Sequence, residues 1–307
     1  MNISLHQLQI FLKVSETQSV TRAAEELHLT QPAVSIQLKN LQDQLDIPII
    51  EMVGKKVFIT DFGKEILDTA RKISDEIDLI SSKASAFRGE LIGKLKIAVV
   101  STGKYVIPYF LSDFIRKHNK VELILDVTNR MRVKESLERN EVDFALVSVL
   151  PDNPKVEYID LMENKLFLVG GKEHTLPNQT VDPMDLNNLP IIFREKGSGT
   201  RHIMEKFIKD NNFQVIKKME LTSNEAVKQA ILADLGYSIM PLIGIGKELD
   251  KGDLCIIPVQ GFPIRSTWRL IWVKNKKLLP VATEYIKFIK ENKEDIIQKK
   301  FAGFNKY

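Results

Sequence analysis

The chain has little cysteine, no long apolar run and no metal-type spacing of ligands. Cys255 is the single cysteine among 307 residues, which excludes an internal disulfide and fits the reducing cytoplasm. No stretch is apolar for the length of a membrane-crossing helix, and the N-terminal segment lacks the regions of a signal peptide. The five histidines form no HxxxH or HExxH pattern, and Cys-x-x-Cys is absent. We therefore expect no metal, no cofactor and no membrane partner.

Positive charge is also scarce at the N-terminal end. Residues 1–90 hold ten lysines and arginines against thirteen aspartates and glutamates, although the whole chain carries a net charge of +4. The positive excess therefore lies in residues 91–307. Any polyanion bound by the N-terminal segment must be held by local placement of side chains and by dimerisation, because bulk charge does not attract it.

A pair of short amphipathic helices joined by a tight turn is predicted over residues 19–45. Small and apolar residues recur at helical spacing in the first helix, and Thr30 and Pro32 suit the cap and first turn of the second. Gln and Asn can pair with adenine edges, Ser with several bases and an Ala methyl with thymine, so the second helix is predicted to lie in a DNA major groove. The residues of its predicted DNA-contacting face are Thr30, Gln31, Pro32, Ala33, Ser35, Gln37 and Lys39. An ordinary helical hairpin with a polar exterior remains the alternative.

A short hairpin is predicted next, with strands over residues 49–52 and 57–60 and its tip at residues 53–56. A hairpin that follows a helix-turn-helix is a wing. Lys55 and Lys56 at its tip are placed to touch phosphates, while a solvated turn is the alternative.

A long helix is predicted over residues 61–89, with Thr60 as its cap. Its apolar positions are spaced alternately by four and three residues, which forms a heptad seam and favours pairing with a helix of a second copy. The residues of this seam are Ile66, Ala70, Ile73, Ile77, Ile80, Ala84 and Phe87. A two-fold dimer reads a pseudo-palindromic site. Packing of this helix against its own N-terminal domain is the alternative.

From residue 91 the pattern changes to alternating strands and helices. Strands are predicted over residues 95–100, 121–128, 142–149, 165–171, 189–193, 215–221, 237–241, 254–259 and 267–274. Helices are predicted over residues 108–118, 132–140, 200–211 and 224–233. This alternation indicates an α/β domain with largely parallel sheets.

The whole chain resembles the LysR-type transcriptional regulators. The pattern AA-x-x-L-x-L-T-Q-P-A-V-S runs from Ala23 to Ser35, and Thr60 and Gly63 match the T-x-x-G that opens the family's linker helix. The resemblance implies a winged helix-turn-helix, a dimerising linker helix and a two-lobed effector domain of periplasmic-binding-protein type. The corresponding ranges are 1–60, 61–89, 91–162 with 267–300 for one lobe, and 163–266 for the other.

Within this family, the effector half is most similar to regulators of carbon-fixation operons, the CbbR type. The segments that carry this similarity are residues 99–108, 129–137 and 193–201. The wing departs from the family pattern P-L-F-x-R, because Met52 stands where the arginine is expected; Lys55 and Lys56 can partly substitute. Asp46 and Gln42 also replace a common glycine and glutamate.

A ligand cleft is predicted where strand ends meet helix N-termini, as in other open α/β folds. Hydroxyls, free N–H groups and nearby cations gather in three such loops, which is anion-binding chemistry. The candidate effector-binding residues are Ser101, Thr102, Lys104, Thr128, Asn129, Arg130, Ser148, Arg194, Ser198, Thr200 and Arg201. We expect a small anionic metabolite, carboxylated or phosphorylated. Each loop alone is alternatively a capping motif beside a solvated base.

The sequence therefore predicts a cytoplasmic, ligand-responsive DNA-binding regulator and not an enzyme. The GSGTR segment lacks the Lys-Ser/Thr of a P-loop, and Cys255 in an apolar strand is expected to be an inert thiol. Expected partners are double-stranded DNA, the effector, further copies of the chain in a dimer or a tetramer of paired dimers, and RNA polymerase. The alternative is a solute-binding sensor with weak or no DNA activity.

Overall fold

The computed structural model describes residues 2–54, 56–87, 90–173, 180, 182 and 189–307. It divides into two compact units, Met1–Arg88 and Gly89–Tyr307, each considered by itself below. None of the helices within the described residues is both long enough and apolar enough to cross a membrane.

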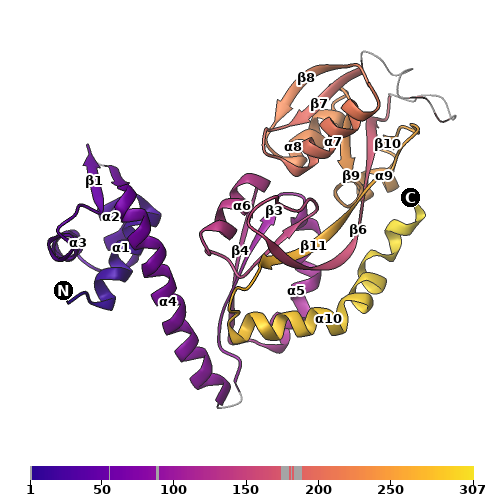
Figure 1. Ribbon diagram of the computed structural model, residues 1–307. Helices are drawn as coiled ribbons and strands as arrows, with labels where there is room; N and C mark the ends of the chain where they lie inside the picture. The colour runs from indigo at the N-terminus through magenta and orange to yellow at the C-terminus, as the bar shows by residue number, and fades with distance from the viewer. Residues whose placement is uncertain (1, 55, 88–89, 174–179, 181, 183–188) are drawn as a thin grey trace. The chain divides into compact units, whose positions relative to one another are not determined.

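The first unit is a three-helix core with a wing and a long helix (Figure 1). Its elements are α1 (Leu5–Thr17), α2 (Val20–Glu26), α3 (Gln31–Leu45), β1 (Ile50–Val53), β2 (Lys56–Ile59) and α4 (Asp61–Phe87). Phe11, Val34 and Leu41 are fully buried between the helices, and the small Ala23 and Ala24 allow α2 to pack closely there. The predicted helix pair and the predicted hairpin are both confirmed.

The long helix α4 changes character along its length. Leu67 and Ala70 are buried in the core of their own unit, so Ala70 does not belong to an outward seam. Further along, the seam residues Ile73, Ile80 and Phe87 are 40%, 67% and 96% exposed. The alternative interpretation is thus confirmed for the first turns, where Ile66 also packs on the core of the unit, while pairing of the later turns with a second copy stays a prediction.

The second unit alternates strands and helices, as the sequence predicts. Its first part contains β3 (Gly93–Val100), η1 (Gly103–Tyr105), α5 (Ile107–Lys117), β4 (Val121–Thr128), α6 (Arg130–Glu138) and β5 (Phe144–Val147). Its later part contains β6 (Val156–Gly171), β7 (Leu189–Arg194), α7 (Gly199–Asp210), β8 (Val215–Leu221), α8 (Asn224–Leu232), β9 (Ser238–Pro241), η3 (Leu242–Gly244), α9 (Gly246–Lys251), β10 (Leu254–Ile256), β11 (Ile264–Val273), α10 (Pro280–Phe301) and η4 (Ala302–Lys306).

The strands form one large sheet and one small one. In the seven-stranded sheet the order is β10-β6-β11-β5-β3-β4, with β9 also paired to β6, and β7 pairs with β8 in the small sheet. The pairs β3–β4, β3–β5 and β7–β8 are parallel, but every pair that involves β6 or β11 is antiparallel. The expectation of largely parallel sheets is therefore wrong for these two long strands, which run alongside each other instead of following βαβ crossovers.

Separate hydrophobic cores define two lobes. The first lobe is built on β3, β4 and β5, and α10 returns to it: Tyr285 is fully buried there, edge-on to Phe114 with ring centroids 5.1 Å apart. The second lobe has cores on the two sides of β7 and β9, covered by α7 and α8. Strands β6 and β11 connect the two lobes (Figure 1).

Candidate functional site

The first candidate site is the exposed face of α3. The Thr30 hydroxyl caps the helix by accepting a hydrogen bond from the Ala33 amide at 3.4 Å, and Gln31 Nε2 donates to Ser35 Oγ at 3.1 Å. Thr30, Gln31, Pro32 and Lys39 are exposed, while Ala33, Ser35 and Gln37 are half-buried. All the described members of the predicted face thus reach solvent.

A groove of about 1100 Å³ lies along this face, between α2, α3 and the wing. It brings together the predicted Gln31, Ser35 and Lys39. It also contains side chains that the sequence analysis did not select, among them Thr21 at the start of α2 and Met52 in β1. The sequence did contain a signal for Thr21. It is a polar residue at the N-terminus of the helix before the predicted DNA-contacting helix, where side chains can reach phosphates.

The wing is fixed to the recognition helix by residues that depart from the family pattern. Gln42 Oε1 accepts hydrogen bonds from the backbone amides of Ile49 and Ile50, at 3.0 and 3.2 Å. Asp46 ends α3 with a φ of 54°, in the left-handed region, which explains why glycine is common at that position. Lys56 is exposed at the wing, and Lys55 lies outside the described residues.

The T-x-x-G motif holds the start of α4 against the wing. Thr60 Oγ1 donates to the Pro48 carbonyl at 2.7 Å and accepts from the Gly63 amide at 2.9 Å. A Cβ on Gly63 would lie 2.1 Å from the Ile49 carbonyl oxygen, so the helix can approach the wing only with glycine there.

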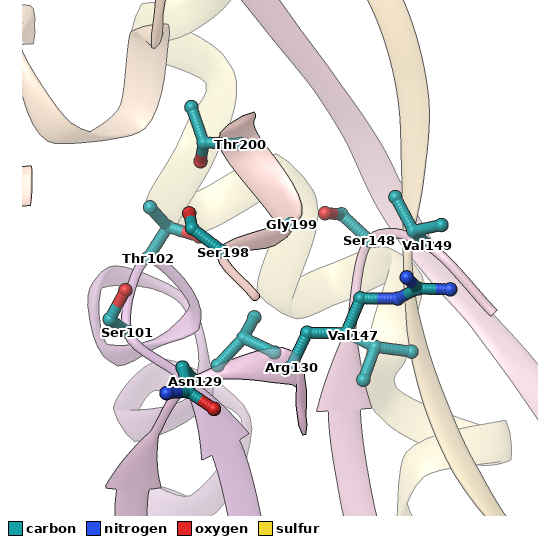
Figure 2. A pocket seen from close by; sticks show the side chains of 11 residues that line it. Ser101, Thr102, Asn129, Arg130, Val147, Ser148, Val149, Ser198, Gly199 and Thr200 are labelled. Atoms are coloured by element: carbon teal, nitrogen blue, oxygen red, sulfur yellow. The ribbon is translucent and has the colours of Figure 1, made fainter. Parts of the chain in front are cut away.

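The second candidate site is a pocket between the two lobes of the second unit, with a volume of about 310 Å³ (Figure 2). We refer to it as the interlobe pocket. Its polar lining consists of predicted residues: Ser101, Thr102, Asn129, Arg130, Ser148, Ser198 and Thr200. Val100, Val147, Val149 and Gly199 complete the wall and were not predicted, because their apolar or absent side chains give no chemical signal.

Two helix N-termini open onto the interlobe pocket. Asn129 caps α6 by accepting from the Arg132 amide at 3.0 Å, and Ser198 caps α7 by accepting from the Arg201 amide at 3.5 Å. Among the described residues that line the pocket none carries a carboxylate, and Arg130 is the cation among them. Its Nη2 donates to the Leu150 carbonyl at 3.3 Å, whereas its buried Nε has no hydrogen-bond partner among the described residues. This arrangement favours a small anion.

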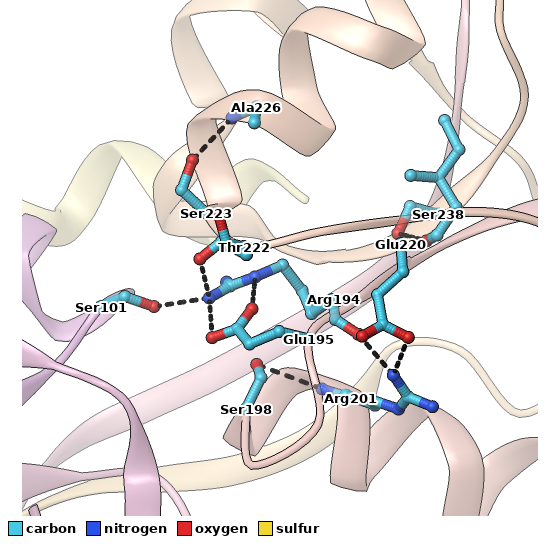
Figure 3. Close-up of polar contacts among 11 residues, drawn as sticks. Ser101, Arg194, Glu195, Ser198, Arg201, Glu220, Thr222, Ser223, Ala226 and Ser238 are labelled. Carbon is cyan, nitrogen blue, oxygen red and sulfur yellow. Dashed lines mark hydrogen bonds and ion pairs between the residues drawn. The ribbon is translucent and has the colours of Figure 1, made fainter. Parts of the chain in front are cut away.

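Arg194 lies next to the interlobe pocket but does not line it (Figure 3). It is 1% exposed and donates from Nε and Nη2 to the Glu195 carboxylate, at 2.9 and 3.1 Å. The same Nη2 reaches Ser101 Oγ at 3.0 Å and the Thr222 carbonyl at 3.5 Å. Because Ser101 belongs to the first lobe and Thr222 to the second, Arg194 fastens the lobes to each other.

Arg201 is likewise committed to neighbours outside the pocket. Its guanidinium contacts Glu205 at 2.6 Å, Glu220 at 2.7 Å and the Arg194 carbonyl at 2.9 Å, and it lies over the Phe193 ring. Hydrogen bonds from Lys217 and then Arg201 lower the pKa of Glu220 to about 2. Burial opposes the charge of Arg201, but the two glutamates outweigh it and raise the pKa of the guanidinium. These acidic partners were not predicted from the sequence, although the Arg201–Glu205 spacing of four residues on a helix is a visible signal.

Two further predicted effector residues lie elsewhere. Thr128 ends β4 without lining the interlobe pocket, and Lys104 lies over the Tyr105 ring and lines a separate cavity. Cys255 in β10 donates to the carbonyls of Gly170 and Gly171, and burial raises the pKa of its thiol, as expected for an inert residue. No group of side chains suited to a metal ion occurs within the described part of the chain.

Two family profiles match the sequence. Residues 5–64 match the profile described as bacterial regulatory helix-turn-helix protein, lysR family, and residues 88–294 match the LysR substrate binding domain. The first match disfavours a sensor without DNA activity. Curated relatives include the HTH-type transcriptional activator CmpR of Synechocystis, 34% identical over 94% of this chain and 95% of that protein. The RuBisCO operon transcriptional regulator of Allochromatium vinosum is 37% identical over 94% of this chain and 96% of its own.

Solved structures agree with this assignment. The regulatory domain of Synechocystis CcmR in complex with 2-PG superposes with a TM-score of 0.63 and 30% identity, covering 66% of this chain and 98% of that one. Full-length CbnR complexed with its target DNA superposes with a TM-score of 0.67, over 94% of this chain and 99% of that one. At 19% identity, the second likeness shows the shared fold alone.

Proposed function

This chain belongs to the LysR family of transcriptional regulators, and we propose that it controls carbon-fixation genes in response to a small anionic metabolite. Relatives that share about a third of its sequence over nearly their whole length are regulators of RuBisCO operons. As a DNA-bound regulator it would work in the cytoplasm, with RNA polymerase as a further partner. The operator would be pseudo-palindromic, because a two-fold dimer presents two recognition helices.

The interlobe pocket carries the proposal about the effector. Two capped helix N-termini, four buried hydroxyl groups (Thr102, Ser148, Ser198 and Thr200) and the Arg130 side chain surround a pocket that has no carboxylate among its described lining residues. The related CcmR domain was solved with 2-PG, so 2-PG is the first ligand to test. Small phosphorylated or carboxylated metabolites form the wider class, because both present compact charge to N–H and hydroxyl donors.

Effector binding would act through the angle between the lobes. A ligand held by Thr102 of the first lobe and by Ser198 and Thr200 of the second favours one lobe arrangement over others. The arrangement of effector domains in a dimer or tetramer would then set the spacing of the DNA-binding units. By linkage the effect is reciprocal, so the effector changes the affinity for DNA by the same factor as DNA changes the affinity for the effector. The corresponding coupling free energy is typically about 1–3 kcal/mol.

A thermal-shift titration of the purified protein with 2-PG and small phosphorylated or carboxylated anions tests the effector proposal. Ligand at about 100 times its dissociation constant adds about 2.7 kcal/mol to the free energy of unfolding. Thr102→Ala should abolish the shift and leave DNA binding by the ligand-free protein intact. Thr283→Ala, an exposed threonine on α10 outside the pocket, is the matched control. A shift that survives Thr102→Ala would place the effector elsewhere.

The exposed half of α4 supports dimerisation. Ile73 and Ile80 are exposed among the described residues, and a second α4 packed along the same seam would bury them. Ile73→Asp would place a charge in that seam, and light scattering should then report a monomer. Lys72→Asp, the exposed neighbour on the same turn, is the control. A dimer that persists in Ile73→Asp would exclude the seam as the interface.

A further inference from the structure

A second cavity lies at the outer edge of the lobe junction, and we refer to it as the lysine pocket. It has a volume of about 910 Å³ and shares no residue with the lining of the interlobe pocket. Three parts of the chain form it: η1 and α5 of the first lobe, η3 and α9 of the second, and the end of α10 with η4. In Figure 1, α10 runs along α5 and its last turns approach α9.

The charge of the lysine pocket is positive. Lys104, Lys228, Lys247 and Lys300 line it, against the single carboxylate of Glu248. Lys228 is neutralised by Glu248 at 2.8 Å and by Glu225 at 3.1 Å. The remaining three lysines form no ion pair with any described residue, and Lys247 and Lys300 are exposed. Lys104 also interacts electrostatically with the Glu225 carboxylate, so Lys247 and Lys300 are the two exposed amines that favour an anionic ligand.

The other wall is aromatic. Tyr109, which is 44% exposed, meets Phe301 edge-to-face with ring centroids 5.2 Å apart, and Phe301 in turn contacts Phe304. Phe304 also closes over Gly246 of α9: a Cβ there would lie 2.8 Å from its ring. Phe301 is buried and Phe304 is half-buried, so the exposed Tyr109 ring beside the lysines is the one suited to stack a flat aromatic group whose charged part reaches the amines.

The floor of the pocket leaves polar groups unpaired. Asn224 is 1% exposed, and neither its side-chain oxygen nor its nitrogen has a hydrogen-bond partner among the described residues. It lies directly behind Gly244 and Tyr105, because a Cβ on Gly244 would come within 2.8 Å of Asn224 Nδ2 and 3.2 Å of the Tyr105 ring. A buried amide without hydrogen-bond partners is unfavourable. A ligand that displaces Gly244 and Tyr105 could therefore form hydrogen bonds with the Asn224 side chain.

From these observations we propose that the lysine pocket binds a second ligand: an organic polyanion that carries an aromatic ring, for which nucleotides are the simplest class. The lysine pocket is the larger of the two cavities, with about 910 Å³ against about 310 Å³ for the interlobe pocket. The two sites communicate through η1, whose residues Lys104 and Tyr105 face one pocket while the preceding Thr102 faces the other. Gly103 packs against Val99 and Leu146 too closely for a Cβ, so η1 moves only with the sheet behind it.

Calorimetric titration of the full-length protein with ATP, GTP, NADP⁺ and NADPH tests this proposal. At least one should bind below about 1 mM, and Lys247→Glu combined with Lys300→Glu should weaken it about tenfold or more. Lys290→Glu, an exposed lysine on α10 outside the pocket, should leave binding unchanged. No binding by any of the four, or binding that survives the double variant, would overturn the proposal.

Two further measurements test whether the aromatic ring of the ligand contributes to binding, and which of the two pockets holds the nucleotide. Tyr109→Ala should weaken the nucleotide but not inorganic tripolyphosphate, which has no ring to stack; equal losses would refute the aromatic wall. Thr102→Ala should leave nucleotide binding in place, because that side chain faces the interlobe pocket. If Thr102→Ala abolishes nucleotide binding, the nucleotide occupies the interlobe pocket and the lysine pocket is not a site.

Discussion

Helices α3 and α7 begin in the same way and differ in what surrounds them. Each is capped by a hydroxyl that accepts a hydrogen bond from the amide three residues on, Thr30 in α3 and Ser198 in α7. The first turn of α3 is exposed along an open groove, whereas Ser198, Thr200 and Arg201 at the start of α7 are buried. The same local chemistry therefore faces an extended polyanion in one unit and a small enclosed ligand in the other.

The cationic side chains near α3 are exposed, whereas those near α7 are held in ion pairs. Lys39 and Lys56 around α3 are exposed and free to meet phosphates. Around α7 the arginines are held by acids: Arg194 by Glu195, and Arg201 by Glu205 and Glu220. Exposed cations are thus present beside α3, while the lining of the interlobe pocket offers N–H groups, hydroxyls and Arg130.

Arg194→Ala should give the largest effect, because it removes one partner of a buried ion pair. Glu195 would be left unpaired beside the lobe junction, and Ser101 and Thr222 would lose their link. Such losses cost about 3–5 kcal/mol of the free energy of unfolding, measurable by urea denaturation. Arg265→Ala removes an exposed pair with Glu163 and should cost about 1 kcal/mol or less. Equal losses in the two variants would show that Arg194 is not the fastening between the lobes.

Ser35→Ala should weaken specific DNA binding by about 1–3 kcal/mol if Ser35 reads a base edge. Binding to a nontarget duplex should change little, so competition between target and nontarget DNA gives the measurement. In the unmodified protein Gln31 Nε2 donates to Ser35 Oγ. The substitution also removes this hydrogen bond, which adds to the loss of DNA affinity. Thr69→Ala on the exposed side of α4 is the control. Unchanged affinity for both duplexes would remove Ser35 from the interface.

Local signals were enough to predict most of the elements and seven of the eleven residues that line the interlobe pocket. Caps such as Thr30, Asn129 and Ser198 form short-range hydrogen bonds, so their type and spacing determine where helices begin. Strands β4 and β8 match their predicted ranges, because apolar residues and turn signals bound them. The pocket hydroxyls follow strand ends and helix starts, and general fold rules bring those together.

Which charged side chains pair with one another was not predictable in the same way. Arg194 and Arg201 have the residue type of an anion site, but Glu195, Glu205 and Glu220 reach them first. The extension of β6 back to Val156 was missed because its charged residues pair across to β11, as Asp160 does with Arg269 at 2.6 Å. Ala70 fits the heptad seam by spacing, yet it is buried in the core of its own unit.

Thr200→Val should have a smaller effect, confined to the effector. The substitution keeps the shape of a buried residue at the start of α7 and removes one hydroxyl from the interlobe pocket. Loss of one hydrogen bond weakens the effector by about 0.5–1.5 kcal/mol, while DNA binding by the ligand-free protein stays the same. Calorimetric titration with 2-PG and a DNA-binding assay on the same preparation measure the two. A parallel loss of DNA binding would mean that the substitution disturbs the fold.

The smallest effect concerns pH and the partners of Arg201. Because the folded-state pKa of Glu220 is about 2 against an ordinary value of 4.5, its ion pairs stabilise the fold fully above pH 4.5, and this contribution is lost as the pH falls toward 2. Glu220→Gln removes the titrating group, so its melting temperature should fall less steeply in that window than that of the unmodified protein. Glu294→Gln, an exposed glutamate on α10, should follow the unmodified protein. If Glu220→Gln follows it as well, the ion pairs of Glu220 with Lys217 and Arg201 do not stabilise the fold.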